Sequence, residues 1–404
     1  MSHRKNGFIA LAVAGIVTGG TLTPAIAGTP DIRGELDAIV KEGTPGVIAR
    51  VNDRGLVAGV ADRATGRRRQ ADERFRIASL TKPFTATVLL RLAADPAVRL
   101  SLDDTVEKWL PGLVQGNGYD GRTITIRQLL NHTSGIYNYN NDKEFLAKFS
   151  GEAFLEHRYD GATPEELVAA GISNPPVFKP GAKGRWHYSD TNYILAGMII
   201  EKATGNTYAH EVERRVIRPL GLRSTSVPGR SPRVPAPAAR HYSTLLGDKV
   251  HDVTEFDPSV AGAAGQLIST TRDITTFWRA LLGGRFLSGE QRREMFTTVG
   301  VEGDDGHGGK GDEYGLGVRK FRLSCQVWVW GHGGMLPGSL SRVGVSMDGR
   351  TVVSLNRNAD WGDQALEDRV IEKAFCPPQA RQTTSPWGTA NQASSALAHA
   401  FQPS

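Results

Sequence analysis

The feature that most constrains the fold is the position of the strand-like segments, which lie near both ends of the 404-residue chain. Residues 46–51 and 56–61 are apolar runs on either side of an Asn- and Gly-bearing turn, a pattern that predicts a hairpin. Three later segments, Val327–Trp330, Arg342–Ser346 and Thr351–Leu355, are spaced like the strands of an antiparallel meander. We therefore expect one antiparallel sheet that is assembled from N- and C-terminal segments.

The middle of the chain has helical patterns instead. Apolar residues recur at helical spacing over Ser79–Ala94 and Asn192–Thr204, and Ala365–Phe375 is expected to be the last helix. The Pro- and Arg-rich stretch Pro228–Pro237 predicts a surface loop. The expected fold class is α+β: the antiparallel sheet flanked by helices, with a mainly helical subdomain at about residues 98–260 inserted into the α/β part.

Both ends of the chain differ in character from its centre. Basic residues precede an apolar run over residues 8–22, and the small-residue triplet at 25–27 follows, so residues 1–27 predict a secretory signal peptide. The run is short for a bilayer and contains glycines, so we expect a secreted protein without a stable membrane anchor. Residues 377–404, rich in Ser, Thr, Ala, Gln and Pro, predict a disordered tail or a removable pro-segment. Residues 28–376 remain as the expected folded domain.

Charge and cysteine content exclude several classes of partner. The net charge is +6, but the basic residues are dispersed and form no basic face with interleaved aromatics, so nucleic acid is not an expected partner. The two cysteines, Cys325 and Cys376, can pair in an exported protein and would tie a strand to the last helix, although two buried free thiols are the alternative. Two cysteines and scattered histidines form no zinc pattern, so we expect neither a metal nor a cofactor.

The first candidate for chemistry is Ser79-Leu80-Thr81-Lys82 at the start of the first long helix. Residues three apart lie on one helix face, so the Ser79 hydroxyl and the Lys82 amine can meet. A desolvated lysine can be neutral enough to take the serine proton, and a helix N-terminus offers N–H groups to an oxyanion. Taken alone, this pattern is more often a serine N-cap beside a solvated lysine.

The second candidate is Tyr188-Ser189-Asp190. A tyrosine close to positive groups can act as a phenolate-like base or as a proton shuttle. The alternative is a packed aromatic residue before a helix that Ser189 or Asp190 caps.

The third candidate is the segment His332-Gly333-Gly334-Met335. Glycines let a strand pass close to a bound substrate, and an N–H group after them could complete an oxyanion hole. The alternative is a glycine-rich bend in an edge strand with an incidental histidine.

Together, the three clusters resemble the penicillin-recognising serine hydrolases, which include secreted D-alanyl-D-alanine carboxypeptidases, class C β-lactamases and related esterases. Their motif order S-x-x-K, Y-x-N/D, H-x-G recurs here as Ser79/Lys82, Tyr188/Asp190 and His332/Gly334. The flanking phrases at residues 75–78, 129–135 and 314–317 are similar too. The resemblance runs from about residue 46 to 376 and looks closest to the secreted actinomycete carboxypeptidases.

The resemblance implies roles for the matching residues. Ser79 would be the acylated nucleophile, Lys82 its basic partner, and Tyr188 the relay of a proton to the leaving group. The residues implied around the substrate are Ser79 and Met335, whose backbone N–H groups would form the oxyanion hole, and Asp190, Arg319, His332, Gly333 and Gly334, with Arg319 on a terminal carboxylate. The implied ligands are peptidoglycan stem peptides or small esters and amides, with β-lactams as covalent inhibitors of a monomer.

Three positions depart from the carboxypeptidase pattern. Asp190 stands where those enzymes usually carry Asn, and its negative charge would raise the Lys82 pKa and oppose an anionic ligand. Gly333 and Met335 stand where close relatives have hydroxyl residues, so Arg319 remains as the obvious anion anchor. The substrate therefore stays open: first a D-Ala-D-Ala carboxypeptidase or related D-amino-acid peptidase, then an esterase or amidase, then a β-lactamase, and finally a non-catalytic penicillin-binding protein.

Overall fold

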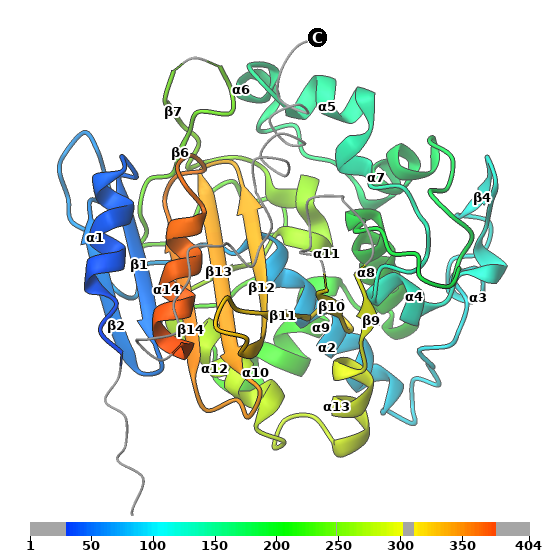
Figure 1. Ribbon diagram of the computed structural model, residues 1–404. Helices are drawn as coiled ribbons and strands as arrows, with labels where there is room; N and C mark the ends of the chain where they lie inside the picture. The colour runs from blue at the N-terminus through cyan, green and yellow to red at the C-terminus, as the bar shows by residue number, and fades with distance from the viewer. Residues whose placement is uncertain (1–29, 248, 302–310, 377–404) are drawn as a thin grey trace, which may run out of the picture.

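The computed structural model describes residues 30–247, 249–301 and 311–376 (Figure 1). Within them, an eight-stranded sheet has the order β2-β1-β14-β13-β12-β11-β10-β9, and its neighbouring strands all run antiparallel. The N-terminal hairpin joins the C-terminal meander where Val47 of β1 lies opposite Arg357 of β14. The expected α+β fold, with one sheet made from both ends of the chain, is confirmed.

The strands of this sheet are β1 (Gly46–Val51), β2 (Arg54–Gly59), β9 (Val299–Gly300), β10 (Glu313–Tyr314), β11 (Arg319–Arg322), β12 (Trp328–Leu336), β13 (Ser339–Ser346) and β14 (Val352–Arg357). Three two-stranded pairs accompany it: β3 (Phe75–Arg76) with β8 (Ile268–Ser269), β4 (Gln115–Gly116) with β5 (Tyr119–Asp120), and β6 (Tyr242–Ser243) with β7 (His251–Asp252).

The α-helices are α1 (Arg33–Lys41), α2 (Lys82–Ala93), α3 (Val106–Trp109), α4 (Ile126–Leu130), α5 (Lys143–Phe149), α6 (Ala153–His157), α7 (Pro164–Ile172), α8 (Asp190–Thr204), α9 (Tyr208–Val212), α10 (Arg218–Leu220), α11 (Gly262–Gly265), α12 (Thr271–Leu282), α13 (Gly289–Phe296) and α14 (Ala365–Phe375). Shorter turns are η1 (Ala78–Thr81), η2 (Gly121–Thr123), η3 (Tyr139–Asn141), the π-helical η4 (Glu213–Ile217) and η5 (Pro258–Ala261).

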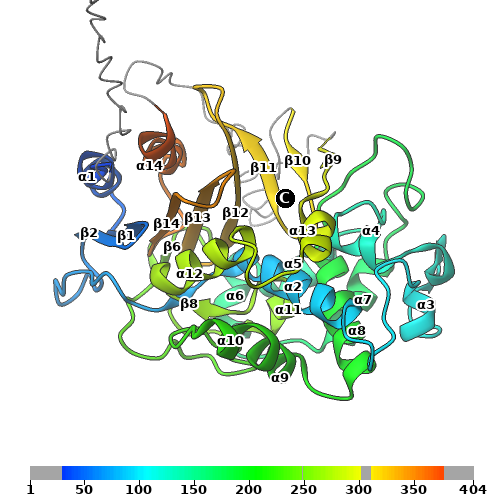
Figure 2. The same ribbon diagram turned by 90° about the horizontal axis from the view of Figure 1, so that it is seen from below.

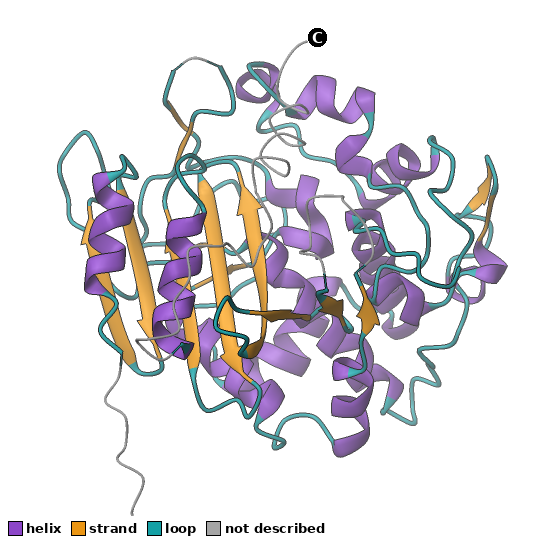
Figure 3. Ribbon diagram, in the orientation of Figure 1, coloured by secondary structure: helices purple, strands orange, loops and turns teal. Residues whose placement is uncertain are grey.

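The molecule has three layers, which Figure 2 shows edge-on. Helices α1 and α14 cover one face of the sheet, and a first apolar core, with Leu36, Leu355 and Ile371 among its members, fills the space between them. The opposite face packs on α2 and α12, and a larger core continues from there into the helices beyond the β9 edge (Figure 3). Helix α2 is buried almost all round, so its N-terminus is held firmly beneath the sheet.

The sequence placed most elements well, with small shifts at their ends. The predicted helix 79–94 begins with η1 and continues as α2, with Pro83 in its first turn, where proline is tolerated. The hairpin turn is shorter than expected, because β2 begins at Arg54. The Pro228–Pro237 stretch contains neither helix nor strand.

A disulfide joins Cys325, in the turn before β12, to Cys376 at the end of α14, with 5.8 Å between their Cα atoms. The predicted pairing of the two cysteines is confirmed. None of the helices in the described part of the chain is long and apolar enough to cross a membrane. The predicted signal peptide at residues 1–27 and the predicted tail at 377–404 lie outside the described residues, and the division at about residues 98–260 stays a prediction.

Candidate active site

Ser79 and Lys82 meet at the junction of η1 and α2. The Lys82 Nζ atom lies 3.0 Å from the Ser79 Oγ atom and 3.1 Å from the carbonyl oxygen of Ala264. Ser79 is partly exposed, whereas Lys82 is fully buried. Ala78, just before the serine, has a φ of +50°, a left-handed conformation that costs a non-glycine residue about 1 kcal/mol and that turns Ser79 toward the cavity described below.

The charge of Lys82 is set by two opposing effects. Burial lowers the pKa of its ammonium group, while an ion pair and hydrogen bond with Asp190 raise it. The rings of Tyr188 and Tyr193 face the ammonium, with centroids 4.7 and 5.4 Å from Nζ. Lys82 is therefore a desolvated amine next to Ser79, as the sequence predicted, and a carboxylate and two aromatic rings surround it.

Tyr188 completes the group around Ser79 through a hydrogen bond between the two side chains. Burial, and then the nearby Asp190, raise the pKa of the Tyr188 phenol well above its usual value. The phenol is consequently protonated at neutral pH, which suits a proton relay and disfavours the phenolate-like base considered from the sequence.

Asp190 is the first residue of α8, which begins after Ser189 as N-cap. Its carboxylate accepts a hydrogen bond from the side-chain amide of Asn140 in addition to pairing with Lys82. The Asp190 backbone N–H donates to the Asn138 side chain over 3.1 Å. Sequence reasoning missed both asparagines, although the alternation of Tyr and Asn over residues 137–141 was a signal that could have found them.

Strand β12 passes directly over the nucleophile. A Cβ atom on Gly334 would lie 3.1 Å from the Ser79 nitrogen and would clash with the carbonyl oxygen of Ile77. Only glycine therefore allows this approach to the backbone before Ser79, while the predicted approach of the strand to a bound substrate stays a prediction. The approach brings the chain just before Met335 next to the Ser79 N–H, which supports the predicted oxyanion hole formed by the backbone of these two residues.

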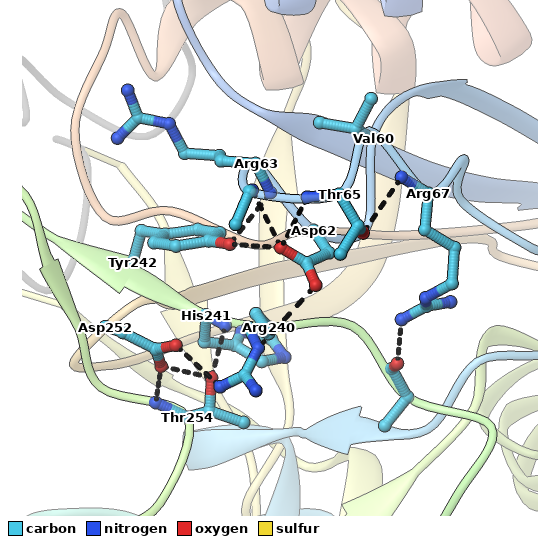
Figure 4. Close-up of polar contacts among 12 residues, drawn as sticks. Val60, Asp62, Arg63, Thr65, Arg67, Arg240, His241, Tyr242, Asp252 and Thr254 are labelled. Carbon is cyan, nitrogen blue, oxygen red and sulfur yellow. Dashed lines mark hydrogen bonds and ion pairs between the residues drawn. The ribbon is translucent and has the colours of Figure 1, made fainter.

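The end of β12 is held in place by the turn that follows it. The Gly338 N–H donates to Asp360 over 2.7 Å, and the Gly338 carbonyl oxygen lies 2.8 Å from His241 Nδ1. His241 in turn belongs to a polar network that joins the loop after β2 to residues 240–254 (Figure 4). In that network Arg240 donates to Asp252 over 2.8 Å.

Two further predicted residues lie beside the nucleophile with partners of their own. His332 Nε2 is 2.8 Å from the Tyr314 hydroxyl, so its ring is fixed within the site. Arg319 on β11 lines the same cavity, and its guanidinium forms a buried ion pair with Asp312. Its predicted role in binding a substrate carboxylate stays a prediction. The ion pair with Asp312 already balances the charge of the Arg319 guanidinium.

Ser79 lines a cavity of about 230 Å³. Its wall is mainly apolar, with side chains from α5, α6, the loop after β6, the segment before η5 and the end of β12: Phe145, Phe149, Phe154, Leu245, Phe256 and Leu336. Sequence reasoning missed this wall because its members are far apart in the chain and look like ordinary core residues. The buried His132 ring was missed too; it lies 4.4 Å from the Tyr188 ring, and its Nδ1 accepts from the Ser189 N–H.

The site can perform acyl transfer at a serine. Ser79 has an amine and a phenol within hydrogen-bond reach, and it faces a cavity large enough for a small substrate. In the described part of the chain, no group of three His, Cys, Asp or Glu residues is placed to hold a metal ion. The fold and the site therefore define the class of serine hydrolases, here with a lysine and a tyrosine beside the serine.

Comparison with known proteins agrees with that class. The family model described as Beta-lactamase matches residues 31–374, and the chain belongs to this family, as the three motifs predicted. Penicillin-binding protein 4* of Bacillus subtilis is 28% identical over 329 residues, which cover 78% of this chain and 67% of that protein. The chain spans about two thirds or less of the length of such curated relatives.

Two solved structures are also similar. A D-stereospecific amidohydrolase from a Streptomyces species is 50% identical, with a TM-score of 0.77 and coverage of 85% of this chain and 97% of that one. A D-amino acid amidase from Ochrobactrum anthropi, solved with L-phenylalanine amide, is 30% identical, with a TM-score of 0.71 and coverage of 85% and 96%.

Proposed function

We propose that this protein is a serine amidohydrolase that cleaves the amide bond on the carbonyl side of an apolar D-amino acid residue. The observation that carries the proposal is the aromatic wall beside Ser79, because it offers an apolar residue a cavity next to the nucleophile. The similarity to a D-stereospecific amidohydrolase at 50% identity supports the D configuration.

The reaction begins with attack of Ser79 Oγ on the substrate carbonyl, while the hydroxyl proton passes to the neutral form of Lys82. The oxyanion is held by the backbone N–H groups of Ser79 and Met335. The C–N bond then breaks, and the leaving amine takes a proton through the Tyr188 phenol, which is replenished from Lys82. Water hydrolyses the acyl-enzyme by the reverse proton path, which releases the carboxylic acid and restores the Ser79 hydroxyl.

The D-Ala-D-Ala carboxypeptidase remains the second candidate, with peptidoglycan stem peptides as substrates and secretion as the setting. It is favoured by the position of Arg319 in the cavity wall. It is weakened by the ion pairs of Arg319 with Asp312 and of Lys82 with Asp190, because these carboxylates reduce the attraction of the site for an anionic substrate.

The deciding experiment compares four substrates with one enzyme preparation: D-phenylalaninamide, L-phenylalaninamide, a diacyl-Lys-D-Ala-D-Ala peptide and a short-chain nitrophenyl ester. The proposal expects kcat/KM for the D-amide to exceed that for the L-amide at least about a hundredfold, a difference of about 3 kcal/mol in transition-state binding. Equal rates on the two amides would refute it. Fast ester turnover without amide hydrolysis would identify an esterase, and release of D-alanine alone a carboxypeptidase.

A further inference from the structure

Arg76 is a buried arginine on β3, three residues before Ser79. Its guanidinium carbon lies 4.3 Å from the centre of the Phe256 ring, and its NH2 atom donates to the Phe256 carbonyl oxygen over 3.1 Å. The same NH2 atom donates to the carbonyl oxygen of Pro232, in the Pro- and Arg-rich loop. Arg76 therefore contacts a residue of the aromatic wall without being among the described residues that line the cavity.

The contact between Arg76 and Phe256 joins a desolvated cation to an aromatic ring. Arg76 is 2% exposed, and in the described part of the chain its Nε and NH1 atoms have no hydrogen-bond partner. Burial lowers the pKa of its guanidinium to about 10, although the nearby Asp257 and Glu255 act in the opposite direction, so the group is still charged at neutral pH. A buried cation is attracted to an aromatic face more strongly than an exposed one. The ring of Phe256 is therefore held by more than apolar packing.

The wall around Phe256 has little apolar packing of its own. Phe256 belongs to a cluster of four buried apolar residues, with Phe154, Leu246 and Val253, which is separate from the two larger cores. The rings of Phe154 and Phe256, with centroids 5.7 Å apart, both line the cavity. Because hydrophobic stabilisation grows with the apolar area that is buried, so small a cluster fixes its members weakly.

Arg76 connects this wall to the segment that carries Ser79. Strand β3, where Arg76 pairs with Ile268 of β8, is followed by η1, which contains Ser79. The Arg76 carbonyl oxygen accepts a hydrogen bond from the Ser339 hydroxyl over 2.9 Å, at the start of β13. The side chain of Arg76 therefore holds the wall, while its backbone is fixed close to the nucleophile.

We infer that Arg76 is a positioning residue that fixes the Phe256 ring relative to Ser79, and that the enzyme thereby selects D residues with an aromatic side chain over those with a small one. Arg76 touches no substrate and acts through Phe256. This inference rests on the proposed function and names the substrate class of the same site.

The test measures kcat and KM for D-phenylalaninamide and D-alaninamide in the wild type, Arg76→Met and Arg76→Lys. Arg76→Met keeps an apolar chain of similar length but loses the charge and the donors. It should raise the KM for D-phenylalaninamide about three- to thirtyfold and leave kcat within about twofold. The KM for D-alaninamide should change less than about twofold, because a methyl group gains little from the wall. Arg76→Lys should lie between the wild type and Arg76→Met, because the cation stays and the planar guanidinium is lost.

Two further variants show whether the effect passes through Phe256. Arg74→Met is the matched control, because the Arg74 side chain donates to Ala236 and Ser224 in the same part of the chain and makes no printed contact with the wall. It should leave the ratio of the two KM values unchanged. Phe256→Leu should raise the KM for D-phenylalaninamide by itself, and adding Arg76→Met to it should raise that KM little further, since contacting residues are not additive.

Other outcomes would overturn the inference. An equal fall of kcat on both amides in Arg76→Met would mean that Arg76 only supports the segment of Ser79, and a lower Tm with an unchanged KM ratio would mean that it only stabilises the fold. Additive effects of Arg76→Met and Phe256→Leu would mean that Arg76 does not act through the ring. If Arg76→Met does not fold, Arg76→Lys takes its place in the same comparison.

A failure of the proposed function is seen separately. If the wild type hydrolyses neither D-amide, the proposed function fails, and the role of Arg76 is then measured with the nitrophenyl esters of phenylacetic and acetic acid. These esters present an aromatic and a small acyl group to the same cavity. Equal ratios of their KM values in the wild type and Arg76→Met would refute the inference.

Discussion

Two regions of the site differ in the kind of residue that forms them. One is the group of Ser79, Lys82, Tyr188 and Asp190, called the corner here, and the other is the cavity-facing part of β12. In the corner, Lys82, Tyr188 and Asp190 are largely buried and joined by side-chain contacts. In residues 332–336 of β12, glycines leave the backbone close to the nucleophile, and side chains from other elements reach over it. Proton transfer needs desolvated side chains with shifted pKa values, whereas substrate alignment needs an accessible backbone. The following changes test that division, beginning with the largest expected effect.

Replacing Ser79 with alanine should abolish the chemistry of the corner. We expect kcat/KM to fall by at least about 10⁴-fold, because no other hydroxyl takes over the covalent step. A fluorescent penicillin should label the wild type and leave Ser79→Ala unlabelled on a denaturing gel. Labelling that survives the substitution would place the nucleophile elsewhere.

Gly334→Ala tests the strand rather than the corner. The added methyl group would clash with the Ile77 carbonyl, so β12 must move away from Ser79 and the oxyanion hole opens. We expect kcat to fall about 10²- to 10³-fold, the effect of losing one oxyanion donor. Gly300→Ala on β9, where a Cβ meets nothing within 4 Å, is the matched control. Similar kcat values in the two variants would refute the close approach.

His241, which contacts the turn after β12, should make the stability of the fold depend on pH. Burial lowers its pKa to about 4 from an ordinary 6.5, and its Nε2 atom has no hydrogen-bond partner among the described residues. Above pH 6.5 the ring is neutral in both the folded and the unfolded chain, and the folded state keeps its full stability. Between pH 6.5 and pH 4 the unfolded chain binds a proton that the folded chain does not, so the free energy of unfolding falls by up to about 3 kcal/mol.

The measurement for His241 is the free energy of unfolding in urea at pH 7 and pH 4. Asn can keep the donor to Gly338 without titrating, so His241→Asn should lose less stability between the two pH values than the wild type does. Burial raises the pKa of the Asp360 carboxyl, so the contribution of Asp360 to stability grows as the pH falls, opposite to that of His241. Asp360 is present in both proteins, so its contribution cancels when their losses are compared. Parallel losses in both proteins would exclude His241 as the titrating group.

Asp190→Asn should have the smallest effect, and that effect should appear in the dependence of kcat/KM on pH. Asp190 raises the pKa of Lys82, so its removal lowers that pKa and leaves more neutral amine at a given pH. The acidic limb of the kcat/KM profile should move to lower pH. The maximal kcat/KM should change by less than the roughly hundredfold loss that follows removal of a proton-transferring group. A limb that stays in place would mean that Lys82 is not the group that titrates there.

How much the sequence could predict differs between the same two regions. Ser79 and Lys82 are three residues apart on one helix, so local geometry predicts their contact. Gly334 was predicted to let the strand pass close to a bound substrate, but its packing against the Ile77 carbonyl, which lies far away in the sequence, was not predicted. Asn140 and His132 were not predicted as parts of the site, because the Tyr and Asn alternation around Asn140 marks a polar segment without showing that it meets Asp190, and no spacing links His132 to Tyr188.

The sequence by itself determined the family, the antiparallel sheet made from both chain ends, the cysteine pair and the order of the three motifs. The sheet follows from periodicity, the family from the resemblance of the three motifs to known proteins, and the cysteine pair from the expected export of a chain with two cysteines. The tertiary structure alone decided that Asp312 balances Arg319, that Arg342 lies over Gly333, and that four phenylalanines form the cavity wall. Charge balance and cavity shape depend on residues brought together from distant segments, and no local pattern records which of them will meet.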